Sequence, residues 1–497
     1  MEPRGSLTED MKSLIEEMDV FFNSKSIAVV GASKITGKVG HIIFRNLADN
    51  QRRGFYEGEL YPINPNEVSI LGYRCYPTLK DVGDKLDLIV IAVPAEVVPS
   101  IMEDAGEKGV KAAVIISSGF SEIGKKDLEE KVKAIAKKAG IRVLGPNCLG
   151  VYDSYTGVDM LFLPETKTLS NRNVVIATPR PTPGNIAIVT QSGAFGAAAV
   201  DHLAGQEMGL SKLISFGNKM DVDEAEMLLY LLHDEKTAVI LLYIEGITSG
   251  REFVDAARLV TKHKPVIALK AGKTEAGARA ALSHTGAIAG SDRIFDGLFK
   301  QVGVLRARNM EGFFDMAKAL ALQTPAMGKS IAIVTDAGGP GIMAADECED
   351  LGLSVDRFSD ETLKKFETLK EEGKIPPFAT YQNPVDLTGV VTSEMYELST
   401  EILFEDQDIH GIIVLGLHHT PYLKEDFTDK IAELSKHYCK PIVGCDIGET
   451  EMAMYIRSRF EKLGIPAYSS PEDAAYAMAA LVRYGVYLNK RDYLSDS

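Results

Sequence analysis

The sequence has few cysteines, no long apolar run and no apolar signal segment, and each shortage excludes a class of protein. Its five cysteines are scattered without a CxxC pair, which argues against a zinc site and favours reduced thiols. The longest apolar run, 474–482, has under half of the roughly 20 residues that a membrane span requires. The N-terminal segment is acidic, so we interpret it as a helix. These absences predict a cytoplasmic protein that does not enter a membrane.

Positive charge is also scarce. The chain has 54 Lys and Arg against 70 Asp and Glu, a formal net charge of −16. This excess of negative charge argues against nucleic acid and anionic membranes as partners. An anionic substrate would therefore be held by local backbone amides and a few basic side chains, not by the electrostatic field of the whole protein.

One pattern occurs three times along the 497 residues: a short apolar run, a turn of small residues and a helical pattern. The copies begin at Ile27, Ile186 and Ile331, so their spacing is that of domains and not that of a solenoid repeat. We therefore predict three α/β domains, each opening with the first strand of a parallel sheet. The predicted limits are 1–150, a proline-rich connection at 151–184, 185–322, a short linker, and 330–490.

The small-residue turns are candidate anion-binding sites. Open parallel sheets bind ligands at the carboxyl ends of their strands, where all three turns would lie. The helix after each turn offers unpaired N–H groups and a partial positive charge, which suit a phosphoryl dianion. We expect such helix starts at Ser192, Gly193 and Ala194 in the second domain, and at Gly338, Gly339 and Gly341 in the third.

The first turn, 31–40, is similar to a dinucleotide loop but departs from GxGxxG. A nicotinamide enzyme usually has an acidic residue after the next strand, whereas this chain continues Asn64-Pro65-Asn66. The turn therefore favours a nucleotide other than NAD, with Ser33, Lys34 and Lys38 available for phosphates. A purely structural glycine turn is the alternative.

His284 lies in 271–291, a segment rich in Gly, Ala, Ser and Thr. We expect a long loop between a strand at 265–269 and a helix beginning near Asp292, and loops of this length are often functional. Neutral imidazole is a good nucleophile near pH 7, so His284 is a candidate carrier of a phosphoryl group. Alternatively, the segment is a phosphate cradle in which His284 only caps a helix.

Glu245 follows an apolar run that is typical of a buried strand. A carboxylate that binds one nitrogen of a histidine orients the ring and favours attack by the other nitrogen. Glu245 is therefore a candidate partner of His284. A helix-capping or ion-paired glutamate is the alternative.

Ten motifs, found in order over nearly the whole chain after about residue 21, resemble the α subunit of ADP-forming acyl-CoA (acetyl-CoA) synthetases, which are relatives of succinyl-CoA synthetase. A segment at 170–178 departs from the family pattern as an apparent insertion. The motifs are GAS (31–33), YPINP (61–65), VPA (93–95), GPNCLG (145–150), QSGAFG (191–196), SFGNK (215–219), YIEG (243–246), SHTG (283–286), DAGGPG (336–341) and NPVDLTG (383–389).

This resemblance implies a Rossmann-like CoA-binding domain followed by two flavodoxin-like CoA-ligase domains. It implies that acyl-CoA and phosphate give an acyl phosphate and CoA, and that the acyl phosphate then phosphorylates a histidine. By resemblance, His284 is that histidine, Glu245 is its partner, and the helices after Gly193 and Gly339 hold the phosphoryl group. The implied CoA-binding residues are Gly31, Ser33, Lys34, Gly37, Lys38, Asn64, Pro65, Val93, Pro94 and Asn147.

The family also passes the phosphoryl group to ADP in an ATP-grasp domain, which we do not find in this sequence. We therefore expect a separate β subunit that binds ADP or ATP and Mg²⁺, in an α2β2 assembly, and no metal on this chain. A CoA-sensing module of a protein acyltransferase system is the rival interpretation. The retained histidine and both helix starts argue against it. The sequence does not identify the carboxylic acid, whose size depends on a pocket expected near Asn147 and Phe195.

Overall fold

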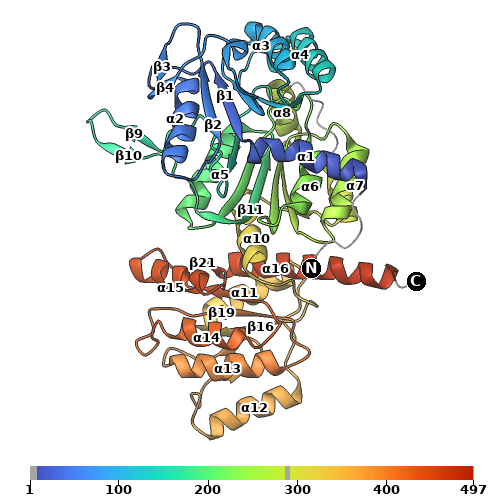
Figure 1. Cartoon of the computed structure of the whole chain (residues 1–497). Coiled ribbons are helices and arrows are strands. Elements are labelled where there is room, and N and C mark those ends of the chain that lie inside the picture. The colour runs from blue at the N-terminus through green and yellow to red at the C-terminus, as the bar shows by residue number, and fades with distance from the viewer. Residues whose placement is uncertain (1–7, 286–291, 496–497) are drawn as a thin grey trace. The chain divides into compact units, whose positions relative to one another are not determined.

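Figure 1 shows the chain as a computed structural model, which describes residues 8–285 and 292–495. The side chains of 281–285 and 491–495 are outside that description. The chain forms two compact units, Met1–Arg306 and Ala307–Ser497, and each is described by itself. Within the described ranges, no helix combines the length and the apolar character needed to cross a bilayer.

The first sheet of unit 1 has five parallel strands in the order β2-β1-β5-β6-β7. Its strands are short continuous apolar runs, as expected for a sheet that is covered on both faces. The strands are β1 (Ser26–Val30), β2 (Glu59–Ile63), β5 (Leu88–Ile91), β6 (Ala112–Ile115) and β7 (Arg142–Leu144), with a small hairpin of β3 (Ser69–Ile70) and β4 (Tyr73–Arg74).

Helices cover both faces of this sheet, which confirms the predicted Rossmann-like architecture of the first domain. One apolar core lies under α3 and α4, and the other lies under α1 and α2 and continues into the second sheet of unit 1. The helices are α1 (Glu9–Asn23), α2 (Val39–Arg52), η1 (Leu79–Asp81), η2 (Ala95–Val97), α3 (Val98–Lys108), η3 (Ser121–Ile123) and α4 (Lys126–Ala139).

The second sheet of unit 1 has the order β15-β14-β13-β11-β12-β8, in which only the edge strand β8 is antiparallel. Five helices accompany it. Its elements are β8 (Val151–Asp153), β11 (Pro183–Thr190), α5 (Gly193–Gly205), β12 (Leu210–Ser215), α6 (Glu224–His233), β13 (Val239–Ile244), α7 (Gly250–Val260), β14 (Val266–Lys270), α8 (Glu275–Thr285), α9 (Asp292–Val302) and β15 (Leu305–Arg306).

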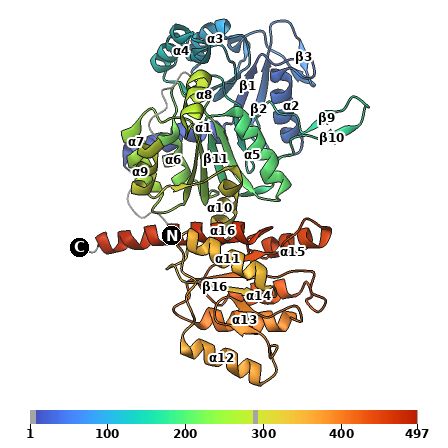
Figure 2. The same cartoon turned by 180° about the vertical axis from the view of Figure 1, so that it is seen from behind.

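The segment 151–184, expected as a connection, contributes to this sheet. Its first residues form the short strand β8, which pairs with β12 at the edge of the sheet. Sequence analysis did not find this strand because three residues are too few to show the alternation of polar and apolar side chains. The remainder contains a hairpin of β9 (Thr166–Thr168) and β10 (Val174–Ile176), which projects from the body of unit 1 (Figures 1 and 2). This hairpin includes most of the apparent insertion.

The expectation of one long loop at 271–291 is wrong for its first part. Residues Glu275–Thr285 form α8, because the alanine-rich run has enough helix propensity to outweigh its glycine. The helix backbone places His284 in the last turn of α8, and α8 lies beside η3 of the first domain. The side chain of His284 and residues 286–291 lie outside the described residues.

Unit 2 contains a third α/β sheet in the order β17-β18-β16-β19-β20-β21, and only β17 is antiparallel. With the two sheets of unit 1, it confirms the predicted fold class. Its elements are α10 (Met310–Leu322), β16 (Ile331–Thr335), α11 (Gly338–Asp350), α12 (Asp360–Glu371), β17 (Thr380–Tyr381), β18 (Val385–Asp386), α13 (Ser393–Glu405), β19 (Gly411–Leu415), α14 (Phe427–Ser435), β20 (Ile442–Cys445), α15 (Glu451–Lys462), β21 (Ala467–Tyr468) and α16 (Pro471–Ser495).

Helix α10 lies beside α16 in unit 2, although the sequence suggested that it closes the second domain (Figures 1 and 2). Phe313 and Phe314 are both buried in α10, so the helix is apolar on more than one face. An ion pair of 2.6 Å from Lys318 Nζ to Glu461 Oε1 joins it to α15. The domain limits at 150, 184, 322 and 330 stay predictions.

Candidate functional site

The turn 31–40 crosses the carboxyl ends of β1, β2 and β5. Gly31 has φ +92°, and a Cβ there would lie 2.4 Å from the carbonyl oxygen of Ala92, so the position requires glycine. The N–H of Gly31 donates to the carbonyl of Ile63 over 3.0 Å. This end of the sheet, where the strand order reverses beside β1, is where open α/β sheets bind ligands.

The polar residues predicted for this turn have different surroundings. Asn64 Nδ2 donates to the carbonyl of Ala32 over 2.7 Å, so this side chain shapes the turn. Ser33 is buried, and Lys34 forms a surface ion pair of 2.7 Å with Glu67. Three further predicted residues are exposed at the rim, namely Gly37, Lys38 and Pro65.

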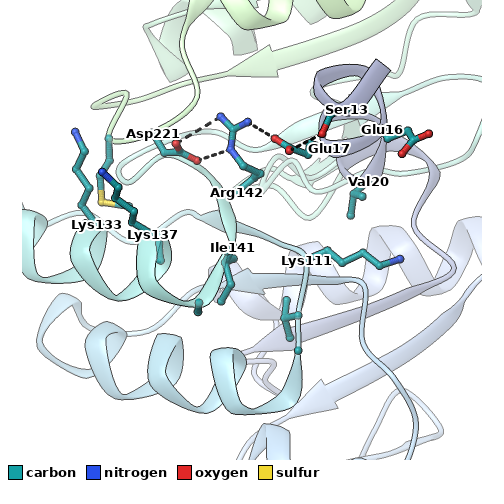
Figure 3. A pocket seen from close by; sticks show the side chains of 16 residues that line it. Ser13, Glu16, Glu17, Val20, Lys111, Lys133, Lys137, Ile141, Arg142 and Asp221 are labelled. Atoms are coloured by element: carbon teal, nitrogen blue, oxygen red, sulfur yellow. Dashed lines mark hydrogen bonds and ion pairs between the residues drawn. The ribbon is translucent and has the colours of Figure 1, made fainter. Parts of the chain in front are cut away.

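A pocket of about 890 Å³ is the larger of two cavities of interest in unit 1, but it lies at the amino ends of β6 and β7 (Figure 3). Arg142 crosses it and pairs with Glu17 at 2.7 Å and with Asp221 at 3.0 Å. These ion pairs join α1 and β7 to the turn before α6, so the charge of Arg142 is already paired within the protein. We therefore assign this cavity no ligand.

The second pocket, of about 730 Å³, lies at the carboxyl ends of the strands and contains six of the predicted residues. It unites residues expected to bind CoA with residues expected to bind phosphate, although the two sets come from different sheets. The predicted residues that line it are Val93, Pro94, Asn147, Ser192, Gly193 and Ala194.

Ser117 joins Val93 to Asn147 on the side of the pocket expected to bind CoA, and sequence reasoning missed it. Its hydroxyl accepts from the N–H of Val93 over 3.1 Å and donates to the carbonyl of Val93 over 2.5 Å. Its carbonyl accepts from the N–H of Asn147, which has φ +57°. A lone serine after a strand carries no recognisable signal, because its two partners are distant in sequence.

The side of the pocket that we expect to bind phosphate is the start of α5. Ser192 caps the helix by accepting from the N–H of Phe195 over 3.2 Å. The N–H groups of Gly193 and Ala194, at the first helical positions, have no acceptor within the helix geometry. Since none of the described residues that line the pocket is charged, these backbone donors are its means of stabilising an anion.

Gln191 couples this helix start to Glu245. Its Oε1 accepts from the N–H groups of Glu245 and Gly246, at 2.5 and 3.0 Å, and its Nε2 donates to the carbonyl of Gly246. Lys219 Nζ donates to the same carbonyl over 2.8 Å. Glu245, only 8% exposed, is thus held at the end of β13, next to a residue that lines the pocket. Sequence reasoning missed the role of Gln191 because both contacts are long-range.

Lys270 is a buried cation that sequence reasoning also missed. It ends β14, in register with Ile244 of β13, and its Nζ lies 4.6 Å from the ring centre of Phe295. Burial lowers the pKa of Lys270, whereas the nearby carboxylates of Asp292 and Glu245 favour its charged form. An amino group with a lowered pKa therefore lies near Glu245, immediately before the segment that carries His284.

Cys148 lines the pocket without being a nucleophile. Its Sγ donates to the carbonyl of Ile115 over 3.3 Å, and burial raises the pKa of the thiol to about 12. At neutral pH it is a protonated, apolar part of the wall. The pocket does lie at Asn147, as expected, but Phe195 is not among its lining residues and stacks on Tyr243 at 4.2 Å.

In unit 2, α11 begins at Gly338 after Ala337, which offers no side-chain cap. A Cβ at Gly339 would meet nothing within 4 Å, whereas one at Gly338 would lie 2.9 Å from Oδ2 of Asp386, so the helix start has open space beside Gly339 only. Asp336 accepts from the N–H of Leu417 and the hydroxyl of Thr420, and burial raises the pKa of Asp336 to about 6.

Comparison with protein families divides the chain into three matched regions. Residues 25–154 match a CoA binding domain, residues 183–320 a succinyl-CoA ligase like flavodoxin domain, and residues 331–485 a Ligase-CoA domain. Each region contains the strands of one sheet, except that β8 of the second sheet falls in the first region.

Similar proteins extend over most of the chain. Subunit α of ADP-forming acetate–CoA ligase I from Pyrococcus furiosus is 38% identical over 484 residues, which cover 95% of this chain and 99% of that subunit. An ADP-forming acetate–CoA ligase of Methanocaldococcus jannaschii is also 38% identical, over 94% of this chain but 63% of that enzyme. This chain thus spans less than two thirds of the second relative.

A solved structure is similar over the same extent. It is the dinucleotide forming acetyl-coenzyme A synthetase 1 of Ca. Korarchaeum cryptofilum, in complex with phosphate and ADP. The TM-score is 0.85 at 36% identity, covering 95% of this chain and 98% of that chain. Together with the 38% identity to a complete α subunit, this likeness shows that the chain belongs to the family of ADP-forming acetate–CoA ligase α subunits.

Proposed function

We propose that this chain is the CoA-binding and phosphohistidine-carrying α subunit of an ADP-forming acyl-CoA synthetase. The complete reaction converts acyl-CoA, ADP and phosphate into a carboxylic acid, ATP and CoA, and is reversible. The observation that carries the proposal is the 730 Å³ pocket, in which Val93, Pro94 and Asn147 of the CoA side meet the start of α5.

In the first step, an oxygen of phosphate attacks the carbonyl carbon of the thioester. The carbon–sulfur bond breaks, and CoA leaves as a thiol after taking up a proton. The N–H groups of Gly193 and Ala194 stabilise the anionic phosphate and the negative charge that develops at the carbonyl oxygen. The lining of the pocket is uncharged, so no charged side chain competes for the anion.

In the second step, a ring nitrogen of His284 attacks the phosphorus of the acyl phosphate. The bond from phosphorus to the acyl oxygen breaks, and the carboxylate leaves. Glu245 accepts a hydrogen bond from the other ring nitrogen, which orients the ring and stabilises its positive charge.

The phosphorylated histidine then reaches a second anion-binding site. We assign that site to the start of α11, at Gly338, Gly339 and Gly341, and the ADP and Mg²⁺ chemistry to an ATP-grasp β subunit in an α2β2 assembly. The turn residues Gly31, Ser33, Lys34, Gly37, Lys38, Asn64 and Pro65 bind the nucleotide end of CoA in this proposal. The assembly works in the cytoplasm.

The decisive experiment is phosphorylation of the purified chain by acetyl-CoA and labelled phosphate. We expect acid-labile, base-stable label in the wild-type protein and none in His284→Asn, whereas the exposed control His263→Asn is labelled normally. Glu245→Gln is expected to slow labelling about 100-fold without loss of CoA binding, because general acid–base and orienting groups contribute this much. CoA binding without any label would contradict the proposal and favour the CoA-sensing role.

A further inference from the structure

Unit 2 contains a histidine–carboxylate pair that the proposed reaction does not use. His418 follows β19 and Asp446 follows β20, and these two strands are parallel neighbours in the sheet. Nδ1 of His418 lies 2.8 Å from Oδ1 of Asp446. The two side chains are 9% and 0% exposed, so the pair is built into the protein and is not a surface contact.

The pair lies beside the start of α11. Asp336, which precedes that helix, accepts from the N–H of Leu417 over 3.2 Å and from the hydroxyl of Thr420 over 2.9 Å, so its contacts flank His418 on both sides. Strand β16 has β18 on one side and β19 on the other. The strand order therefore reverses at this edge, which is where open α/β sheets bind ligands.

The hydrogen bonds of His418 leave one ring nitrogen for chemistry. An ionised Asp446 accepts from the Nδ1–H, so the lone pair of the neutral ring is at Nε2. Nε2 lies 3.4 Å from Oγ1 of Thr450, which is an exposed residue. The edge of the ring that carries the lone pair therefore faces the surface of unit 2.

Backbone donors lie close to this nitrogen. Thr450 is the N-cap residue of α15, but its hydroxyl makes no capping hydrogen bond, and α11 also begins without a side-chain cap. The first N–H groups of both helices thus have no acceptor within the helix geometry. Such groups stabilise a phosphoryl anion, and here they accompany a nucleophilic ring nitrogen.

Asp446 is better suited to a charged ring than to a neutral one. Its Oδ2 has no hydrogen-bond partner among the described residues, and Arg457 donates to the backbone carbonyls of Asp446 and Gly448. Burial raises the pKa of Asp446, whereas the hydrogen bond and charge of His418 lower it. A phosphoryl group on Nε2 would give the ring a positive charge, and a buried carboxylate is stabilised by such a partner.

We propose that His418 is a second phosphoryl carrier of this chain and that Asp446 is its positioning residue. The inference rests on the proposed function, which supplies the phosphoryl group. Nε2 of His418 attacks the phosphorus of phosphorylated His284, the phosphorus–nitrogen bond at His284 breaks, and its electron pair stays on that nitrogen. The hydrogen bond from Nδ1 to Asp446 is kept, so this step moves no proton. ADP is the later acceptor.

The first test maps the label in the full chain after reaction with acetyl-CoA and labelled phosphate. After proteolysis at alkaline pH, we expect label in the peptide that contains His284 and in the peptide that contains His418. His418→Asn should lose the second label and keep the first, whereas the exposed control His419→Asn should keep both. Label on His284 alone in the wild-type chain would overturn the inference and leave the proposed function intact. Absence of label from both peptides would overturn the proposed function.

The second test concerns Asp446. Asp446→Asn should lower the labelling of His418 about 100-fold and leave that of His284 unchanged, because orienting and acid–base groups contribute this much. Nitrogen NMR of the imidazole should show the proton on Nδ1 in the wild-type chain and a loss of this preference in Asp446→Asn. An unchanged tautomer with unchanged labelling would show that Asp446 does not position the ring.

The third test bypasses His284 by using phosphoramidate, a small phosphoryl donor to imidazole nitrogens. In the His284→Asn chain, we expect it to phosphorylate His418 about tenfold faster than the exposed His437, because the oriented ring and the helix N–H groups favour the transfer. Adding Asp446→Asn should remove this advantage. Equal rates at His418 and His437 would overturn the inference, whatever the result with acetyl-CoA.

Discussion

The same strand–turn–helix device occurs in both units, as β11 followed by α5 and as β16 followed by α11. In both, a threonine ends the strand and its hydroxyl accepts from the N–H two residues on: Thr190 from Ser192 over 3.1 Å, and Thr335 from Ala337 over 3.0 Å. In both, the next side chain binds backbone N–H groups after the neighbouring strand. Gln191 binds Glu245 and Gly246, and Asp336 binds Leu417.

The two copies differ in charge and in capping. Gln191 is neutral, whereas Asp336 is an acid whose pKa burial raises to about 6. Ser192 caps α5, whereas Ala337 leaves α11 without a side-chain cap. The shared part of the device is thus its backbone geometry, which presents N–H groups at the sheet edge. The side chains set the local stability and its response to pH.

The largest expected effect comes from covering each helix start with a branched side chain. A Cβ at Gly193 meets Leu149 at an ordinary 3.4 Å, and one at Gly339 meets nothing within 4 Å, so a Cβ fits at both positions. Gly193→Val and Gly339→Val should each reduce the rate of a phosphoryl step about 100-fold, because the anion loses backbone donors. Gly193→Val should slow the labelling of His284 from acetyl-CoA and phosphate, and Gly339→Val the transfer to ADP in the presence of the β subunit.

The matched control is Gly205→Ala at the other end of α5, where a Cβ also has open space. It should label at the wild-type rate. Phosphoryl transfer to ADP at the wild-type rate in Gly339→Val would contradict the prediction. The start of α11 would then have the same backbone geometry as the start of α5 but would not bind the phosphoryl group.

A smaller effect concerns pH. The folded pKa of Asp336, about 6, lies above its ordinary 3.8, so the protonated form is favoured by folding. Its contribution to stability is therefore complete below pH 4 and is lost as pH rises through 6. A folded pKa that lies one pH unit above the unfolded pKa corresponds to about 1.4 kcal/mol of stability.

Asp336→Asn removes this titration, so the stability of wild-type unit 2 relative to the variant should fall by roughly 3 kcal/mol between pH 4 and pH 7. Hydrogen exchange of the Leu417 amide, which donates to Asp336, measures the change. Parallel pH curves for the two proteins would show that Asp336 stays ionised.

The smallest effect comes from exchanging the caps. Ser192→Ala removes the acceptor of the Phe195 N–H and should lower the stability of α5 by about 1 kcal/mol. Ala337→Ser should add a cap to α11 and raise its stability by a similar amount. Local hydrogen exchange in each helix reports both changes. Changes of the same sign in the two variants would contradict the capping argument.

The elements that the sequence predicts well are those with a strong local signal. Residues such as Ile27 and Val29 lie in continuous apolar runs and form buried strands, and the helices after Gly193 and Gly338 begin where the turns indicated. Helix α8 was missed because its glycine, serine and threonine residues are typical of a loop, although its alanines favour a helix.

The sequence predicts two sets of candidate site residues and a pocket near Asn147 and Phe195, but it does not identify all the residues that line the pocket. Asn147 and Gly193 each stand in a recognisable turn, whereas their meeting in one pocket depends on how two sheets pack. Ser117, Gln191 and Lys270 act through partners that are distant in sequence or through burial. Neither property produces a local sequence pattern, so these residues could be identified only from the structure.

The buried thiol of Cys148 has a consequence for the fate of an acyl group in this pocket. A thiolate beside a thioester can attack it and take over the acyl group. An acyl group transferred to the protein in this way would no longer be available to phosphate. With a pKa of about 12, the thiol of Cys148 is protonated at neutral pH, and a protonated thiol is a poor nucleophile. In the proposed reaction, the sulfur of Cys148 therefore does not compete with phosphate for the acyl group.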